Sequence, residues 1–267
     1  MTHSDMRIIA LDTVGSRAEG SLGDLFSEHL AALDPTVLDT LDFPWFPGPI
    51  PPLRQRASAI MARLSIRMSQ GHTIVAHCSN AALACALTSM MIESGHQVDR
   101  LIMFAPLHVD LTVIEGHAST LFKKLGMPAD QSSSLSHEVW SEQNAQDFSA
   151  LKLTAVHFQR LATELAGNLG VDEDEIPEFA SSLCEQYMKW LSHLASNLHA
   201  DRPTVCRPVE IVEEDIEAGR ENIAKITSIE AAKVHHSPLP TAFTDENLRS
   251  LFTQIIAAPP LSADRAG

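Results

Sequence analysis

The chain has 267 residues, 45% of them hydrophobic, which suffices for a substantial core in one large domain or in one domain with an inserted subdomain. Its 34 acidic residues outnumber its 19 lysines and arginines and give a formal charge of −15. This balance argues against a general nucleic-acid binder, because contacts to phosphates need a cationic face. No apolar run of about 18 residues is present, and none begins near the start of the sequence, so neither a membrane span nor a signal peptide is predicted.

The four cysteines indicate a reducing compartment. They lack the CxxC spacing of zinc sites, and their spacing does not support a disulfide framework. We therefore predict no metal and no cofactor, and we expect a cytoplasmic protein with reduced thiols. The cysteines are Cys78, Cys85, Cys184 and Cys206.

Strand and helix patterns alternate over the first 110 residues. Such alternation, with nearly continuous apolar strands, predicts a mostly parallel sheet with helices on both faces. The helix over 53–70 has an apolar stripe, and Gly71 and Gly95 are expected to end their helices as C-terminal caps. The predicted strands cover 7–11, 36–43, 72–78 and 99–107, and the predicted helices cover 21–33, 53–70 and 80–95.

Strand patterns disappear between about 111 and 200, where the sequence predicts helices and one mobile loop, "DQSSSLS". Strands return in "PVEIVEED" and "AAKVHHSPL", and an amphipathic helix, "DENLRSLFTQIIAA", closes the fold. We therefore divide the chain into an N-terminal half of an α/β core (1–110), a helical insertion (111–200) and a C-terminal part of the core (201–267).

The stretch "IVAHCSNAAL" turns from a strand into a helix at Cys78. A residue at such a turn lies at the carboxyl edge of a parallel sheet, where open α/β sheets bind ligands. The helix amino terminus beside it presents N–H groups that favour a thiolate. This is the geometry of a nucleophile elbow, in which the residues two before and two after the nucleophile must be small. Ala76 fits this rule, whereas Asn80 departs from it.

Ser79 is the alternative nucleophile. Choosing Ser79 would place His77 at one of the two crowded positions, where Ala76 stands if Cys78 is chosen. A histidine fits that position far worse than an alanine, so the pattern favours Cys78. A third reading is that Cys78 is a buried structural residue beside a decayed elbow. Cys85, two helical turns further among alanines, is expected in the core.

The segment "AHCSNA" resembles the "GHSFGG"-like elbow of the α/β-hydrolase thioesterases of polyketide and nonribosomal peptide synthesis, although both glycines are lost. The following "ALACALTSMMIESGHQVDRLIMFAP" is similar to the course of that family, a helix of small residues, a glycine and a buried strand. The resemblance covers most of the chain in element order. It implies an α/β-hydrolase fold with a helical lid at 111–200, and it puts Cys78 in the place of the nucleophile.

The resemblance also implies a base and an acid. The histidine of the family precedes the last helix, where this chain has His235 and His236, and "HSPL" favours His236. Many of these enzymes have an aspartate directly after the strand that follows the elbow, but here that position is Ala105. Asp110 and Asp215 are the two replacements, and we favour Asp215, since the general α/β-hydrolase fold often keeps its acid there. A solvated acidic loop is the alternative reading of "EED".

Two backbone N–H groups are needed to stabilise an oxyanion. One is expected from Ser79, directly after the nucleophile. The other is expected from the loop after the first strand, with Thr13 or Val14 as donor, and Val14 is our choice. Gly15 would let the backbone approach closely.

A cysteine nucleophile would keep the acyl group activated as a thioester. We therefore expect an enzyme that takes an acyl chain from a carrier-protein thioester onto Cys78 and then releases it, cyclises it in a Dieckmann-type reaction, or transfers it. An editing hydrolase of the type II thioesterase kind is one alternative. A non-catalytic acyl-binding protein derived from a hydrolase is the other.

The partner that the resemblance implies is a phosphopantetheinylated acyl or peptidyl carrier protein. Carrier proteins are typically acidic, as is this chain, so docking would need a local basic patch. One candidate is the face formed by Arg56, Arg63 and Arg67, and the other is the pair Lys123 and Lys124. An ordinary solvated face remains the alternative reading of these residues.

Overall fold

The computed structural model describes residues 6–13, 22–26, 30, 33, 35–42, 51–64, 71–146, 149–198, 204–205, 209–229, 232–237 and 246–259. Over these residues the elements are β1 (Met6–Asp12), α1 (Leu22–Phe26), β2 (Thr36–Asp39), α2 (Leu53–Arg63), β3 (Gly71–His77), the 3₁₀ turn η3 (Cys78–Asn80), α3 (Ala81–Glu93), β4 (Val98–Phe104), α4 (Leu111–Lys124), α5 (Ala129–Val139), α6 (Glu142–Gln146), α7 (Ser149–Leu169), α8 (Ile176–Leu198), β5 (Thr204–Val205), β6 (Val209–Glu213), α9 (Ile216–Ile226), β7 (Ser228–Ile229), β8 (Ala232–His236) and α10 (Glu246–Ala257).

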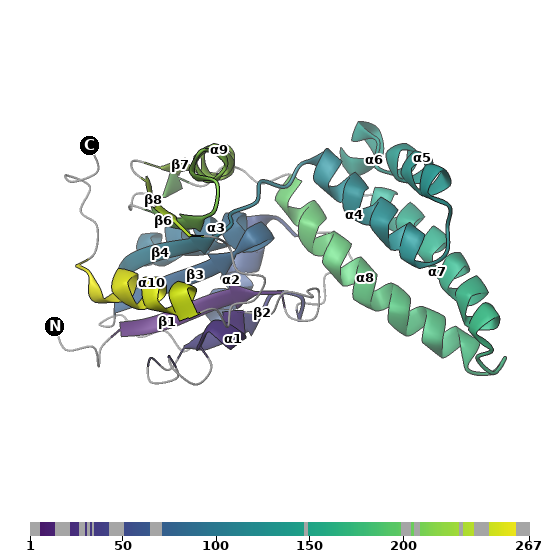
Figure 1. Ribbon diagram of the computed structural model, residues 1–267, viewed down its shortest axis with the longest axis horizontal. Coiled ribbons are helices and arrows are strands. Elements are labelled where there is room, and N and C mark those ends of the chain that lie inside the picture. The colour runs from purple at the N-terminus through teal and green to yellow at the C-terminus, as the bar shows by residue number, and fades with distance from the viewer. Residues whose placement is uncertain are drawn as a thin grey trace. The chain divides into compact units, whose positions relative to one another are not determined.

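The chain divides into two compact units (Figure 1). Unit 1 comprises Met1–Asp42, Pro52–His108 and Ala200–Gly267, and it contains the strands together with α1, α2, α3, α9 and α10. Unit 2 comprises Phe43–Pro51 and Val109–His199, and it contains the helices α4 to α8.

The main sheet of unit 1 has six strands in the order β2-β1-β3-β4-β6-β8, and every neighbouring pair is parallel. A short parallel pair, β5 and β7, forms a separate sheet. Because all six strands run in the same direction, their carboxyl ends meet at one edge. The residues that follow β1, β3, β4, β6 and β8 therefore gather at that edge, where open α/β sheets bind ligands.

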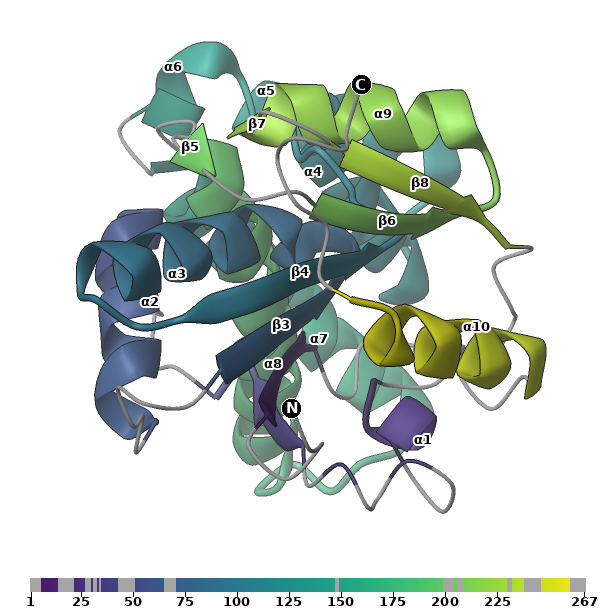
Figure 2. The same cartoon turned by 90° about the vertical axis from the view of Figure 1, so that its left-hand side faces the viewer.

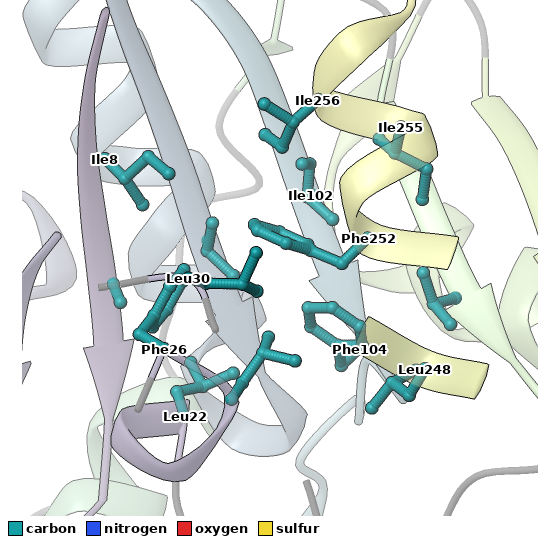
Figure 3. Packing of buried hydrophobic residues seen from close by; sticks show 14 residues of the cluster. Ile8, Leu22, Phe26, Leu30, Ile102, Phe104, Leu248, Phe252, Ile255 and Ile256 are labelled. Carbon is teal, nitrogen blue, oxygen red and sulfur yellow. The ribbon is translucent and has the colours of Figure 1, made fainter. Parts of the chain in front are cut away.

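Helices cover both faces of this sheet, as the sequence predicts. On one face, α1 and α10 pack against side chains that alternate along the strands (Figures 2 and 3). Phe252 of α10 lies at the centre of this layer. Its ring centroid is 5.5 Å from that of Phe26 and 6.1 Å from that of Phe104. The layer consists of Ile8, Ala10, Leu22, Leu25, Phe26, Leu30, Val75, Ile102, Phe104, Val212, Leu248, Phe252, Ile255 and Ile256.

The opposite face of the sheet is equally apolar. Its strand residues are fully buried, and α2, α3 and α9 cover this side (Figure 2). A strand buried on both sides explains why the sequence shows continuous apolar runs rather than alternation. The residues of this face include Ile9, Leu11, Ile74, Ala76, Leu101, Met103 and Ile211.

Helix α2 is shorter than the sequence predicts. It ends at Arg63, and Leu64 is already extended, with φ −84° and ψ 121°. Gly71 does not cap a helix but begins β3. A side chain at Gly71 would place its Cβ 2.0 Å from Oδ2 of Asp99, so the Asp99 side chain would have to move to accommodate it. By contrast, Gly95 follows α3 with a left-handed φ of 82°, which confirms its predicted role as a helix end.

The predicted basic docking face on α2 is wrong for Arg56. Arg56 is 1% exposed, and burial lowers the pKa of its guanidinium to about 9. A side chain buried to this extent cannot contact a docking partner. Arg63 is exposed, and Arg67 lies outside the described residues. Lys123 and Lys124, in the last turn of α4, are both exposed.

Unit 2 corrects a second prediction. The stretch "DQSSSLS" belongs to the helix α5 and is not a loop, because two of its serines lie on a helical face that packs inward. Ser132 and Ser136 are buried, and the Ser132 hydroxyl lies 3.3 Å from that of Ser119 on α4. Within this unit Phe158 packs between Phe122 and Tyr187. Among the described helices, none is both long and apolar enough to cross a membrane.

Candidate active site

Cys78 directly follows β3 and is the first residue of the helical turn η3, which leads into α3. It has a φ of 54°, in the left-handed region that L-residues other than glycine, asparagine and aspartate rarely adopt. The Cys78 carbonyl accepts a hydrogen bond from the Leu107 N–H at 3.2 Å, so the segment after β4 supports the turn. Backbone strain of this kind costs about 1–3 kcal/mol and is found preferentially at functional sites. The position of Cys78 at a tight strand-to-helix turn agrees with the predicted register.

Asn80 stands where the elbow of the family has a glycine, and the backbone tolerates it. Asn80 has a φ of −77°, which any residue adopts, so glycine is not required there. Its side chain is fully buried, and its Oδ1 lies 2.9 Å from the Thr40 hydroxyl. The same hydroxyl lies 2.8 Å from the Asp12 carbonyl oxygen. Asn80 and Thr40 therefore connect the elbow to the carboxyl ends of β1 and β2.

Ala105 is a second left-handed residue at this edge. It follows β4, the strand next to β3, and has a φ of 43°. Its N–H donates to the Val212 carbonyl at 3.0 Å, which continues the pairing of β4 with β6. The position where many thioesterases have an aspartate is thus occupied by a methyl group, and Ala105 supplies no carboxylate.

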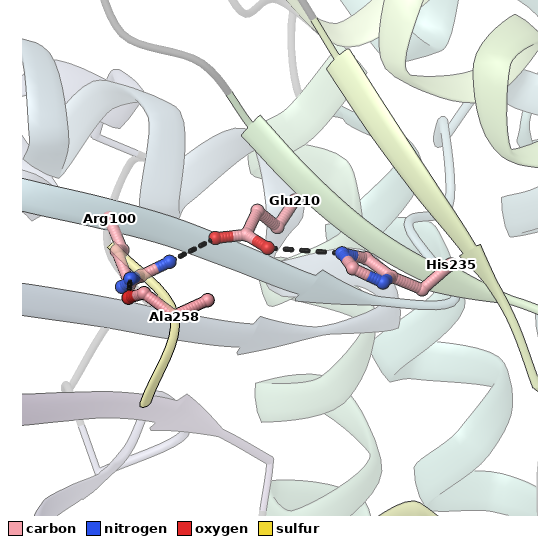
Figure 4. Close-up of polar contacts among 4 residues, drawn as sticks. All are labelled: Arg100, Glu210, His235 and Ala258. Atoms are coloured by element: carbon pink, nitrogen blue, oxygen red, sulfur yellow. Dashed lines mark hydrogen bonds and ion pairs between the residues drawn. The ribbon is translucent and has the colours of Figure 1, made fainter. Parts of the chain in front are cut away.

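His235 belongs to a buried ionic network (Figure 4). Its Nε2 lies 3.0 Å from Oε2 of Glu210, and Oε1 of the same carboxylate accepts from Arg100 Nη1 at 2.5 Å. Arg100 also donates to the Ala258 carbonyl at the end of α10. Burial opposes the charge of Glu210, but His235 and then Arg100 outweigh it and hold the pKa of this carboxyl below its ordinary value. The contacts of His235 thus place it in a structural network.

His236, the last residue of β8, has a different environment. It is exposed, and its Nδ1 lies 2.9 Å from the backbone carbonyl oxygen of Glu214. A carbonyl can only accept a hydrogen bond, so Nδ1 must carry the proton. In the neutral ring Nε2 then keeps its lone pair. This is the tautomer that a general base needs, and the choice of His236 over His235 stays a prediction.

The two candidate acids are both helix N-caps. Oδ1 of Asp215 accepts from the N–H groups of Glu217 and Ala218, at 3.0 and 3.1 Å, at the start of α9. Asp110 accepts from the Val113 N–H at the start of α4, in unit 2. The described contacts of His236 are to the Glu214 carbonyl rather than to the Asp215 carboxylate. The catalytic role of Asp215 remains a prediction.

The predicted oxyanion donors are described in part. Ser79 is buried and is the second residue of η3, directly after Cys78. The Thr13 N–H donates to Oδ1 of Asp12 at 2.9 Å, which removes it as an available donor in this conformation. Val14, the preferred second donor, lies outside the described residues, as does Gly15.

The other described cysteines differ from Cys78 in their burial. Cys85 is fully buried in α3, and burial raises the pKa of its thiol to about 12. Burial also raises the pKa of Cys184 in α8. Cys78 is half-buried, and none of these three cysteines forms a disulfide. Among the described residues, no group of three or more histidine, cysteine, aspartate or glutamate side chains could hold a metal ion.

Sequence reasoning missed Glu213, a buried carboxylate at the end of β6 that organises the turn before α9. It also missed the polar connection from Asn80 to Thr40. A glutamate at the end of an apolar strand, as in "VEIVE", was the available signal for Glu213. No local pattern predicts the second contact, because its two residues are 40 positions apart.

The sequence matches no protein-family model, and no curated protein sequence matches it. Solved structures do match. YbtT, a type II thioesterase from a yersiniabactin NRPS/PKS biosynthetic pathway, is 12% identical, with a TM-score of 0.51, over 96% of this chain and 92% of that chain. A four-domain nonribosomal peptide synthetase with bound AMP and glycine is also 12% identical, with a TM-score of 0.51, over 96% of this chain and 20% of that chain. Human thioesterase 2 is 10% identical, with a TM-score of 0.46, over 95% of this chain and 94% of that chain.

The sheet order, the helices on both faces and the matches to YbtT and to the nonribosomal peptide synthetase establish an α/β-hydrolase fold. The fold resembles that of thioesterases, as predicted from the elbow segment, and this part of the sequence interpretation is confirmed. The identity of the nucleophile stays a prediction.

Proposed function

We propose that the protein is a thioesterase-type enzyme that accepts an acyl chain onto Cys78. The observation that carries this proposal is the left-handed backbone of Cys78, with φ 54°, between a parallel strand and a helix. A residue with a Cβ atom, such as cysteine, costs free energy in this conformation that a glycine would not. A nucleophile that must point out of the carboxyl edge of the sheet gives a reason for this cost.

The proposed first step is a thiol exchange. The Cys78 thiolate attacks the carbonyl carbon of an acyl thioester, a new C–S bond forms, and the bond to the carrier thiol breaks. Nε2 of His236 takes the proton of Cys78 and returns it to the departing thiolate, so that charge and protons balance. The donor expected for the oxyanion is the Ser79 N–H.

Cys78 directly follows β3, and His236 is the last residue of β8; these strands are three positions apart in the sheet, which corresponds to about 14 Å between their backbones. The side chains span part of this distance, so proton transfer needs the substrate-bound state or a bridging water to complete the path. Catalytic hydrogen bonds often form only in such complexes, and the separation in the absence of substrate does not count against His236.

A cysteine suits onward transfer of the acyl group. Exchange of one thioester for another is close to thermoneutral, whereas an acyl-serine is a more stable oxoester. The chain could then pass to water, to a carbon nucleophile in a Dieckmann-type cyclisation, or to a second carrier thiol. The names of the matched structures, which refer to NRPS/PKS thioesterases and synthetases, support a carrier-protein thioester as the substrate class. Hydrolytic editing is the alternative outcome of the same acyl-enzyme.

A non-catalytic acyl-binding protein is the competing function. The observation that favours it is Ala105, which stands where many thioesterases have the acid and supplies no carboxylate. In this function the elbow would be a remnant, and Cys78 would form no covalent intermediate.

Reaction with an acyl N-acetylcysteamine thioester, followed by intact-protein mass spectrometry, distinguishes the two functions. We expect an adduct that maps to Cys78, is absent from Cys78→Ala, and persists as an oxoester in Cys78→Ser. His236→Ala should lower the acylation rate by about 10²–10⁴, the usual contribution of a general base, whereas His235→Ala should mainly lower stability. Binding of the acyl compound without any adduct, even at long incubation, would support the non-catalytic function.

A further inference from the structure

Glu213 is a buried carboxylate that the proposed reaction does not use. It is the last residue of β6 and is 9% exposed. Its Oε1 accepts a hydrogen bond from the Glu214 N–H at 2.9 Å. The side chain therefore folds back on its own turn and binds the N–H group that directly follows it.

The space around Glu213 is adapted to this conformation. Its Cγ and Cβ lie 3.1 and 3.2 Å from the place that a Cβ at Gly219 would occupy. Gly219 is in the first turns of α9 and is buried. Any side chain at Gly219 would press on the stem of Glu213, so this glycine allows the close packing of α9 on the carboxylate.

The turn that Glu213 binds is the one that holds His236. Glu213 and His236 are partners in the register of β6 and β8. The Ser237 N–H donates to the Glu213 carbonyl at 3.1 Å, and Nδ1 of His236 donates to the Glu214 carbonyl at 2.9 Å. The end of β8 is thus attached to this turn at two points. One is the Glu213 carbonyl, which shares its peptide unit with the N–H that the carboxylate binds, and the other is the Glu214 carbonyl of the next peptide unit.

Packing alone does not explain a glutamate here. Val209 and Ile211, which point to the same face of β6, are apolar. Burying a carboxyl group costs free energy, and burial raises the pKa of Glu213. An apolar side chain would fill the same space without that cost. What it could not do is accept a hydrogen bond from the Glu214 N–H of the turn.

We propose that Glu213 is a positioning residue that holds His236 in its Nδ1-protonated orientation through the carbonyl of Glu214. The inference rests on the proposed role of His236 as the base that serves Cys78. Here the backbone carbonyl occupies the place beside Nδ1 that a carboxylate has in a Ser-His-Asp triad. Asp215 then contributes by capping α9, which fixes the far side of the same turn.

The test compares Glu213→Ala with Glu213→Gln, which retains an acceptor oxygen, and with Glu221→Ala, which removes an exposed carboxylate from α9. Acylation of Cys78 by a soluble N-acetylcysteamine thioester gives kcat and KM, and ¹⁵N NMR of the imidazole rings gives the tautomer of His236. We expect Glu213→Ala to lower kcat about 10–100-fold, within the contribution of a general base, with KM unchanged and a mixed tautomer. Glu213→Gln and Glu221→Ala should stay close to wild type in both measurements.

Gly219→Ala provides a second, milder perturbation, because its Cβ would displace Glu213 without removing the carboxylate. Like Glu213→Ala, it should convert the Nδ1-protonated tautomer of His236 into a mixture of the two tautomers. An unchanged tautomer in Glu213→Ala and in Gly219→Ala would overturn the positioning role, whatever the activity. If the wild type forms no acyl-enzyme, the proposed function fails, yet the NMR measurement still decides whether Glu213 orients His236.

Discussion

Replacing Ala105 by glycine should stabilise unit 1, because Ala105 has a left-handed φ of 43°. An alanine in that region costs about 1–2 kcal/mol relative to its right-handed conformation, and glycine removes this cost. Glycine also makes the unfolded chain more flexible, which opposes the gain by about 0.4–1 kcal/mol. The N–H of residue 105 still donates to the Val212 carbonyl. The net expectation is a stabilisation of about 0.5–1 kcal/mol.

Native-state hydrogen exchange of the β4 amides, followed by mass spectrometry, reports on unit 1 specifically. About 1.4 kcal/mol corresponds to a tenfold change in the equilibrium constant for opening. Amide exchange in Ala105→Gly should therefore be about two- to fivefold slower than in the wild type. Ala81→Gly is the matched control. Ala81 lies at the same sheet edge with an ordinary helical φ of −57°, so glycine there should cost about 1 kcal/mol and speed up exchange.

Cys78→Gly extends this comparison to the proposed nucleophile. Because Cys78 has a φ of 54°, Cys78→Gly should be stabilised by a similar free energy but should lose all acylation. Cys78→Ala should lose acylation without being stabilised. If exchange in Ala105→Gly were as fast as in Ala81→Gly, the left-handed backbone at this edge would carry no energetic cost. The reasoning from strain to function at Cys78 would then lose its basis.

Three further predictions concern other parts of the molecule. Glu210→Ala leaves the buried Arg100 without its carboxylate and should cost about 3–5 kcal/mol in urea unfolding. Because the pKa of Glu210 is held below its ordinary value of 4.5, its contribution is complete above that pH and should be lost as the pH falls further. Alkylation of the native protein at pH 8 should leave Cys85 unmodified, since burial raises its pKa to about 12. Lys123→Glu with Lys124→Glu should slow acylation from a carrier protein, more so at low salt, but not from a soluble thioester.

The sequence predicts the α/β core of unit 1 well, because both faces of its strands are buried. Ile74 and Val75 point to opposite faces, and each is fully buried, which is why the run over β3 is continuously apolar. Such runs, separated by amphipathic helices, are typical of a parallel sheet with helices on both sides. The position of Cys78 follows from where one run ends and the next helix begins.

The errors arose where side-chain composition conflicts with tertiary packing. Four serines within residues 130–136 predict a loop, but Ser132 and Ser136 are buried on the inner face of α5, where the Ser132 hydroxyl lies 3.3 Å from that of Ser119. The spacing of Arg56 predicts a place on a basic surface, although its side chain in α2 is buried. A pattern of charges on a helix does not reveal which of them face the core.

The candidate site shows the same division between local and long-range information. The elbow is a local feature, so "AHCSNA" predicts it even without its glycines, and Asn80 is tolerated because its φ is ordinary. The surroundings of His236 are not local: Glu213 and Glu214 precede it by more than 20 residues and meet it only through the pairing of β6 with β8. A search for an acid by family position finds Asp215, whose carboxylate caps a helix. A search by geometry finds a backbone carbonyl, held in place by a glutamate that no motif contains. For a thiol nucleophile this substitution is chemically reasonable, because the thiol is more acidic than a hydroxyl and depends less on a third charged group.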